Sequence, residues 1–201
     1  MHKLANLSHD AIRQRLKPTL APTHDLPRDA LSSRLRKAAV LIPFVQQDGE
    51  WHILFIQRTE HEKDRHSGQV AFAGGRYEEG DESLEMTALR EAHEEVGIEP
   101  AHVRILGELN HHYSISNYEI TPIVATIPWP YTLTLQSSEV AAAFTIPLRW
   151  LADPQNHSLE YRQFNGADIP VVYFKKYNGY LLWGATARMT ISLLTLLKDE
   201  A

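Results

Sequence analysis

Apolar residues along the chain form short runs and alternating patterns that predict several β-strands. Residues 38–45 have the continuous apolar character of a buried strand, and residues 51–56 have the same character. Between them lies Asp48-Gly49, a dipeptide typical of a hairpin turn, so the two segments are expected to pair. Further strands are expected at residues 69–72, 103–109, 119–127, 159–164 and 171–174.

Two longer segments show helical periodicity. Residues 83–96 place apolar side chains on one face, and Gly97 is a typical residue for ending a helix. Residues 185–197 predict a closing helix. This mixture of elements indicates an α/β or α+β sandwich in which a mixed sheet lies between helices.

The N-terminal region differs from the rest of the chain. Ser8 is a suitable cap for a short helix that runs to about Lys17, and three prolines between residues 18 and 27 then interrupt regular structure. We therefore divide the chain into an arm and connector, residues 1–34, and a main domain, residues 35–201. The arm can pack on the main domain or on a second copy of the chain in a homodimer.

Composition narrows the classes of function. The formal net charge of −5 argues against a nucleic-acid-binding protein, although a bound metal would still allow a small anionic substrate. Cysteine is absent, which excludes disulfides and thiolate chemistry. The sequence shows no signal peptide and no apolar run long enough to span a membrane, so we expect a cytoplasmic protein without a membrane partner.

The segment from residue 74 to residue 98 carries the candidate chemistry. At about 100° per residue, Glu91, Glu94 and Glu95 share an arc beside the apolar stripe of the predicted helix. Crowded carboxylates repel one another unless a cation lies between them. Mg²⁺ prefers oxygen ligands and commonly bridges carboxylates to substrate phosphates.

Glutamate pairs on helices usually form solvated surfaces, and Glu94-Glu95 alone favours that interpretation. The double glycine Gly74-Gly75 changes the balance, because glycine allows the backbone to approach a ligand closely. An acidic turn follows, and then Arg90-Glu91 precedes the glutamate pair. The whole combination indicates a metal and phosphate site.

This segment resembles the Nudix box, G-x5-E-x7-R-E-U-x-E-E-x-G-U, in which U is apolar. Residues 90–98, REAHEEVGI, match its second half. The first half contains one extra residue, so its first acid is either Asp81, counted from Gly75, or Glu82, counted from Arg90.

The resemblance implies a Nudix-type α/β/α sandwich and metal-dependent substitution at phosphorus, with Mg²⁺ or Mn²⁺ as the cofactor. It implies that the metal ligands are Glu91, Glu94 and Glu95, with a carbonyl oxygen of Gly75 as an additional ligand. Arg90 completes the expected catalytic set, either by touching substrate phosphate or, as we favour, by pairing with acids and orienting them.

The identity of the general base stays open at this point. Glu91 and Glu94 are the leading candidates. Many Nudix enzymes place a further acid in a loop beyond the box, and Glu139 could fill that role. Its alternative interpretation is a carboxylate at the start of a helix.

A second resemblance concerns the substrate. Residues 54–59, LFIQRT, and residues 66–75, HSGQVAFAGG, are similar to the motif of coenzyme A diphosphatases, L-L-T-x-R-S-x3-R-x3-G-Q-V-A-F-P-G-G. It implies cleavage of coenzyme A to 3′,5′-ADP and 4′-phosphopantetheine. The implied substrate-binding residues are Arg58, Arg65, Gly74 and Gly75.

The match departs from that motif in the loop after Thr59, which is one residue longer. Asp64 falls where the motif has arginine, and either Lys63 or Arg65 could replace that cation. Ala73 stands where the motif has proline.

Several alternatives accompany this interpretation. Within the class, the substrate could be ADP-ribose, NADH or another nucleoside diphosphate derivative, and outside it the chain could be a Nudix-fold binding domain without turnover. Arg58 could be a simple surface charge. Tyr180 and Trp183 could stack on adenine, although core packing is the commoner role. The histidines His61, His66 and His93 lack a recognised zinc spacing.

Overall fold

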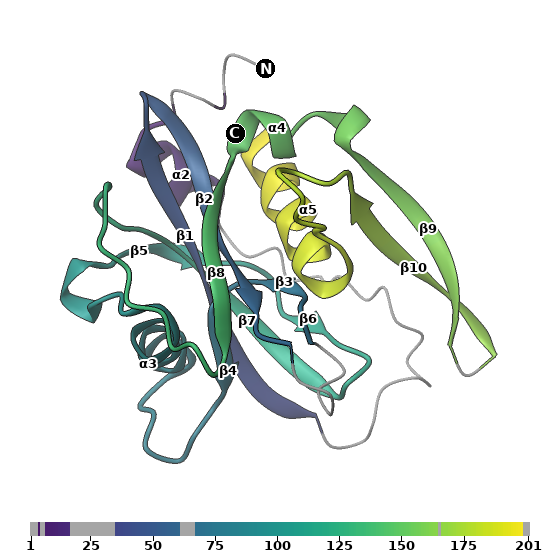
Figure 1. Cartoon of the computed structure of the whole chain (residues 1–201), viewed down its shortest axis with the longest axis horizontal. Coiled ribbons are helices and arrows are strands. Elements are labelled where there is room, and N and C mark those ends of the chain that lie inside the picture. The colour runs from purple at the N-terminus through teal and green to yellow at the C-terminus, as the bar shows by residue number, and fades with distance from the viewer. Residues whose placement is uncertain (1–3, 5–6, 17–34, 61–66, 165, 199–201) are drawn as a thin grey trace.

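The computed structural model describes residues 4, 7–16, 35–60, 67–164 and 166–198. A central sheet runs through the molecule with helices on both of its faces (Figure 1). Its strands are β1 (Arg36–Gln47), β2 (Glu50–Arg58), β3 (Val70–Ala71), β4 (Gly74–Arg76), β5 (Arg104–Glu108), β6 (His112–Tyr113), β7 (Tyr118–Thr126) and β8 (Val140–Pro147).

The remaining elements surround this sheet. Strands β9 (His157–Phe164) and β10 (Ala167–Phe174) form a separate hairpin. The helices are α2 (His9–Arg15), α3 (Leu84–Val96), α4 (Leu148–Leu151) and α5 (Gly184–Lys198), with 3-10 turns η2 (Pro100–His102) and η3 (Pro154–Asn156). None of the helices in the described ranges is long and apolar enough to cross a bilayer.

The sheet is mixed, as the sequence predicted. Its main path runs β3-β2-β1-β7-β5, while β4 pairs with β1, β6 with β7, and β8 with β2. Strands β1 and β7 are parallel, and the other pairs are antiparallel. The predicted β1–β2 hairpin is confirmed, with Asp48 and Gly49 both at positive φ in its turn.

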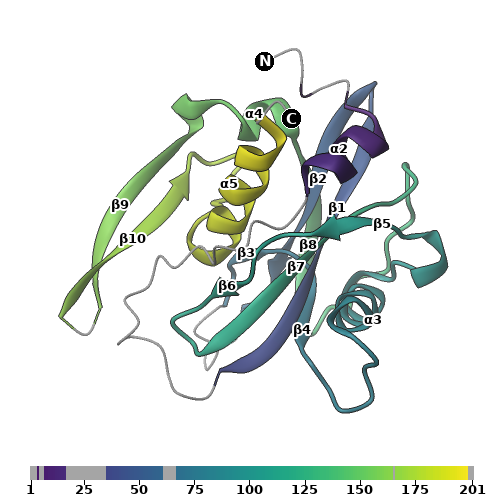
Figure 2. The same cartoon turned by 180° about the vertical axis from the view of Figure 1, so that it is seen from behind.

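Alternating side chains of the sheet build two cores, one on each face. Leu54 and Ile56 of β2 belong to the core that includes α3. Ile53 and Phe55 belong to the core that includes α2 and α5. Figure 2 shows α3 on one side of the sheet and α2 with α5 on the other. The three-layer α/β/α sandwich is therefore confirmed.

Local sequence signals define the ends of α3. The hydroxyl of Ser83 accepts a hydrogen bond from the backbone N–H of Met86, which satisfies a donor at the helix start. Gly97 ends the helix in the left-handed conformation, with φ 71°, which costs glycine little. The predicted helix and its end at Gly97 are thus confirmed.

The N-terminal helix packs on the main domain. Ser8 caps α2, as expected, and Ile12 lies buried among core residues. The indole N–H of Trp51, in β2, donates to the carbonyl oxygen of Leu7 at 2.8 Å. The described part of the arm therefore packs on the main domain of its own chain, which is one of the two arrangements expected.

Strand β8 was not expected from the sequence. Residues 141–143 are three alanines, which have low β-propensity, so the segment gives a weak strand signal. Pairing with β2 over residues 140–147 determines its structure instead. The expectation that Glu139 could begin a helix is wrong, since it lies in the turn that leads into β8.

Candidate active site

The candidate site lies where α3, β4, the end of β2 and the start of β8 meet (Figure 1). The backbone N–H of Gly74 donates to Glu95 Oε2 at 2.9 Å, which ties the double glycine to the helix. Arg58 Nη1 lies 3.9 Å from Glu95 Oε1. The backbone N–H of Thr59 donates to the carbonyl oxygen of Glu139 at 2.8 Å, so segments far apart in the sequence converge here.

Glu95 is the most deeply buried acid of the site, with 3% of its surface exposed. Burial raises the pKa of its carboxyl to about 7, while the Gly74 N–H and the Arg58 charge act in the opposite direction. The negative charges of Glu91 and Glu139 raise the pKa further. Glu95 therefore carries a costly charge that a bound cation would stabilise.

Glu91 faces Gly75. Its pKa is raised, chiefly by burial, although Arg90 opposes the shift. A β-carbon built on Gly75 would lie 2.4 Å from Glu91 Oε1. A β-carbon at this position would therefore force the Glu91 carboxylate to shift.

Glu94 differs from the other two glutamates, because 56% of its side chain is exposed. Its Oε2 accepts a hydrogen bond from Arg90 Nη1 at 3.1 Å. Within the described parts of the chain, no three histidine or acidic side chains converge closely enough to hold a metal ion as they stand. The structure thus places Glu91 and Glu95 together and leaves Glu94 directed towards solvent and Arg90.

Arg90 lies at the centre of an acidic cluster, because it donates hydrogen bonds to Asp81, Glu91 and Glu94. Its Nε and Nη2 donate to the two carboxylate oxygens of Asp81 at 3.0 and 3.1 Å. Its Nη2 also donates to the carbonyl oxygen of Arg76, and its Nη1 donates to Glu91 Oε1 at 2.9 Å. Bidentate pairing fixes the guanidinium plane, so Arg90 can orient the acids around it.

The structure distinguishes between the two candidates for the first acid of the box. Asp81 is buried and accepts hydrogen bonds from Arg90, from the Thr87 hydroxyl and from the backbone N–H of Glu78. The hydrogen bonds from Arg90 lower the pKa of Asp81 to about 2. Glu82 is exposed. Asp81 is therefore the partner of Arg90, and Thr87 is a supporting residue that the sequence did not reveal.

Glu139 belongs to the same electrostatic environment. Its negative charge raises the pKa of both Glu91 and Glu95. Its own side chain is exposed. The pairing of β8 with β2 brings this carboxylate to the edge of the site from a position far along the sequence.

The residues present fit a hard divalent ion. Glu91 and Glu95 offer carboxylate oxygens whose charges are destabilised by burial and by neighbouring carboxylates. Oxygen donors of this kind suit Mg²⁺ or Mn²⁺. His93 is turned to Glu99, with 3.5 Å between Nδ1 and Oε1, and it does not add to this donor set. His61 and His66 lie outside the described residues.

On the expected substrate side, Arg58 is 31% exposed at the end of β2. Lys63, Asp64 and Arg65 lie outside the described residues. The rings proposed for adenine already stack on other aromatic rings: Trp183 on Tyr173 at 5.6 Å, and Tyr180 on Phe144 at 3.7 Å. Those contacts agree with the packing role.

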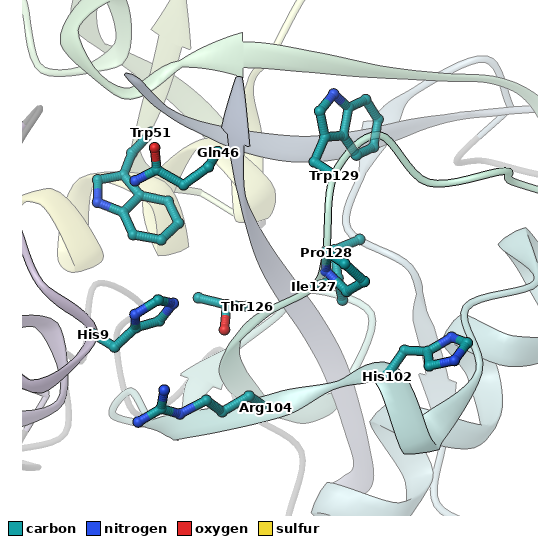
Figure 3. Close-up of a pocket in the computed structure, with 9 residues that line it drawn as sticks. All are labelled: His9, Gln46, Trp51, His102, Arg104, Thr126, Ile127, Pro128 and Trp129. Carbon is teal, nitrogen blue, oxygen red and sulfur yellow. The ribbon is translucent and has the colours of Figure 1, made fainter. Parts of the chain in front are cut away.

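A hollow of about 350 Å³ lies at the other end of the sheet, away from the acids (Figure 3). Trp51, from β2, and Trp129, after β7, form two of its walls, and His9 comes from α2. None of its lining residues belongs to the cluster around Arg90. The hollow is therefore separate from the candidate active site.

Comparison with known proteins agrees with this geometry. Residues 35–165 match the sequence model of the NUDIX domain. The chain is 38% identical over 180 residues to the protein named "Uncharacterized Nudix hydrolase NudL" from Enterobacter sp. (strain 638), covering 82% of this chain and 92% of that protein. It is 40% identical to the protein of the same name from Escherichia coli O7:K1, covering 76% and 78% of the two chains.

A solved structure supports the same fold. The MutT/nudix family protein from Enterococcus faecalis superposes with a TM-score of 0.54 at 14% identity, covering 84% of this chain and 62% of that one. The chain therefore belongs to the Nudix hydrolase family, enzymes that generally need divalent metal ions and act on small molecules with a nucleoside diphosphate linkage.

Proposed function

We propose that this Nudix hydrolase cleaves coenzyme A to 3′,5′-ADP and 4′-phosphopantetheine. The observation that carries the proposal is the position of Arg58, whose Nη1 lies 3.9 Å from Glu95 Oε1. Arg58 is the arginine of the segment similar to the coenzyme A motif, and Glu95 is an acid of the Nudix box. Their proximity joins the substrate motif to the candidate metal site.

In this proposal Glu91 and Glu95 hold Mg²⁺ or Mn²⁺, with Gly75 against Glu91 and with Glu94 at the solvent side. A bound divalent ion supplies charge neutralisation for the diphosphate and makes a water molecule more acidic. Arg90 keeps Glu91 in place through its own anchorage on Asp81. Arg58 is positioned to bind a phosphate group of the substrate by charge-assisted hydrogen bonds.

The proton of the attacking water needs an acceptor. Glu91, Glu94 and Glu139 are the candidates, because each presents a carboxylate at or beside the cluster. Glu95 has its Oε2 committed to the Gly74 N–H, which suits an anchoring role better than proton transfer. We favour Glu91 as the acceptor, because Arg90 holds its carboxylate in a defined position within the cluster.

The proposal extends to the chain as a whole. Residues 35–201 form the hydrolase domain and residues 1–34 an arm and connector, of which α2 packs on the domain. The absence of cysteine suits a reducing compartment, and we propose that the enzyme acts in the cytoplasm as a homodimer.

A comparison of specificity constants tests the substrate. kcat/KM is measured with Mg²⁺ and with Mn²⁺ for coenzyme A, dephospho-coenzyme A, ADP-ribose and NADH, because this ratio reports differential transition-state binding. We expect coenzyme A to be the preferred substrate and dephospho-coenzyme A, which lacks the 3′-phosphate, to be weaker. The Glu95→Gln variant serves as the inactive control. A preference for ADP-ribose or NADH would reject coenzyme A while retaining diphosphate hydrolysis.

A further inference from the structure

Strand β9 forms an exposed edge of the molecule. It pairs with β10 on one side only among the described residues, and the hairpin stands beside α5 with β9 outermost (Figures 1 and 2). Leu159 is 51% exposed and Tyr161 is 66% exposed. An open edge of this kind presents unpaired backbone N–H and C=O groups with which another strand can pair.

The pairing of β9 with β10 shows which backbone N–H and C=O groups of β9 face the open edge. Tyr161 lies opposite Pro170, which has no N–H to donate. Antiparallel pairs alternate between those that exchange hydrogen bonds and those that do not, and proline fits the second kind. The N–H and C=O of Tyr161 therefore point to the open edge. By the same alternation, so do those of Leu159 and Gln163.

The charges on β9 select one register for a second copy. Residues whose backbone N–H and C=O face the open edge must pair with residues of the same kind in the second copy. The register can therefore shift only in steps of two residues. With Tyr161 opposite itself across a twofold axis, Glu160 lies opposite Arg162 of the second copy. A shift of one step places Glu160 opposite Glu160, or Arg162 opposite Arg162. Within one copy Arg162 Nη2 already lies 3.7 Å from Glu160 Oε2. Only the central register adds complementary charge pairs between the copies, and these are the close, non-hydrogen-bonded pairs.

Leu159 and Tyr161 lie on the face of β9 opposite to Glu160 and Arg162. Leu159 pairs with Val172, which is buried in the core that includes α5. Leu159 itself is not covered by that core and stays exposed. In the central register Leu159 and Tyr161 from both copies come together in one strip. Pairing would extend the two-stranded hairpin into a four-stranded sheet across the two copies.

We propose that two copies of this chain associate through antiparallel pairing of β9 with β9, centred on Tyr161. The interface is isologous: the same strand contributes to both sides of a twofold axis. The hydrogen bonds of Leu159, Tyr161 and Gln163 hold the strands together, while the Glu160–Arg162 pairs set the register. This inference concerns assembly and does not depend on which substrate the enzyme cleaves.

Charge reversal provides the test. Glu160→Lys or Arg162→Glu alone turns both cross-strand pairs repulsive, and we expect the dimer dissociation constant to rise roughly tenfold or more. The double variant Glu160→Lys/Arg162→Glu restores opposite charges and should restore the dimer. An equimolar mixture of the two single variants should form a heterodimer, because each strand then carries one sign of charge. Sedimentation equilibrium over a concentration series measures all four.

A matched control lies on β5, an edge strand of the central sheet. Glu108→Lys, in β5, makes the same change of net charge as Glu160→Lys at an exposed edge position and should leave the dimer constant unchanged. Circular dichroism and melting temperature verify that each variant is folded. The proposal is overturned if the wild type is a monomer at all concentrations. It is also overturned if single reversals have no effect, or if neither the double variant nor the mixture associates.

Discussion

Gly75 and Glu91 are in such close contact that a β-carbon on Gly75 would lie 2.4 Å from Glu91 Oε1 and 2.5 Å from its Cδ. Gly75 belongs to β4 and Glu91 to α3, so this contact fixes how closely the strand and the helix approach. The carboxylate cannot yield freely, because Arg90 Nη1 also holds its Oε1. The contact gives a steric reason for a glycine at position 75.

Replacing Gly75 with alanine should displace Glu91 and lower kcat/KM by roughly 100-fold, the effect of a misplacement of about 1 Å at a catalytic centre. Gly80→Ala is the matched control, since a β-carbon there meets nothing within 4 Å. Both variants are compared by steady-state kinetics and melting temperature. Equal activity of the two variants would show that the Gly75 contact does not matter for turnover.

Glu95→Gln should abolish most turnover and change how the metal-free protein responds to pH. Burial raises the pKa of Glu95 from 4.5 to about 7, so the folded protein binds the proton more tightly than the unfolded chain. Its stabilising contribution is present below pH 4.5 and is lost as the pH rises to 7. The wild type should therefore lose on the order of 3 kcal/mol over this window.

The glutamine variant lacks that titration and keeps an acceptor for the Gly74 N–H. It should match the wild type near pH 4.5 and exceed it in free energy of unfolding above pH 7, as measured by urea denaturation in the presence of EDTA. A variant with wild-type activity across a magnesium titration would exclude Glu95 from the metal site. Identical pH profiles of stability would show that its burial carries no electrostatic cost.

Asp81→Asn should destabilise the protein by about 2 kcal/mol, because Arg90 loses its charged bidentate acceptor. Glu82→Gln, the neighbouring exposed position, should change stability by less than about 0.5 kcal/mol. The pKa of Asp81 is lowered from 3.8 to about 2, so its contribution is complete above pH 3.8 and is lost as the pH falls to 2. Urea denaturation of both variants between pH 2 and pH 7 measures the difference, and equal effects would contradict the assignment of Asp81.

Glu139→Gln separates two roles of this acid. If Glu139 acts only through its charge, the variant should lower the pKa of Glu91 and of Glu95, since the wild-type charge raises both. Carboxyl NMR titration of the metal-free protein measures these shifts, and Glu79→Gln, on the exposed turn, is the control. A fall in kcat of roughly 100-fold or more would instead identify Glu139 as the general base.

Metal titration tests the donor set directly. Binding of Mn²⁺, followed by electron paramagnetic resonance, should weaken strongly in the Glu91→Gln and Glu95→Gln variants, whose parent carboxylates lie within the cluster. Glu82→Gln should bind like the wild type. Undiminished binding in the first two variants would place the metal elsewhere.

The sequence by itself determined the elements whose signals are local. Ser83 and Gly97 mark the ends of α3 through backbone hydrogen bonding and conformation, which depend on near neighbours. Helical spacing then puts Glu91 and Glu95 on adjacent positions of one face. The mixed sheet between helices followed from the same periodicities, and the box in residues 74–98 indicated the family.

Tertiary structure decided what depends on residues far apart. Sequence counting left Asp81 and Glu82 equivalent, and only the folded turn buries one of them against Arg90 and Thr87. Helix geometry grouped Glu94 with the other glutamates, yet packing on the sheet leaves it exposed. The alanines of β8 carry almost no strand signal, because pairing with β2 supplies the energy that local propensity lacks. That pairing is also what brings Glu139, which the sequence offered only as a candidate, to the edge of the site.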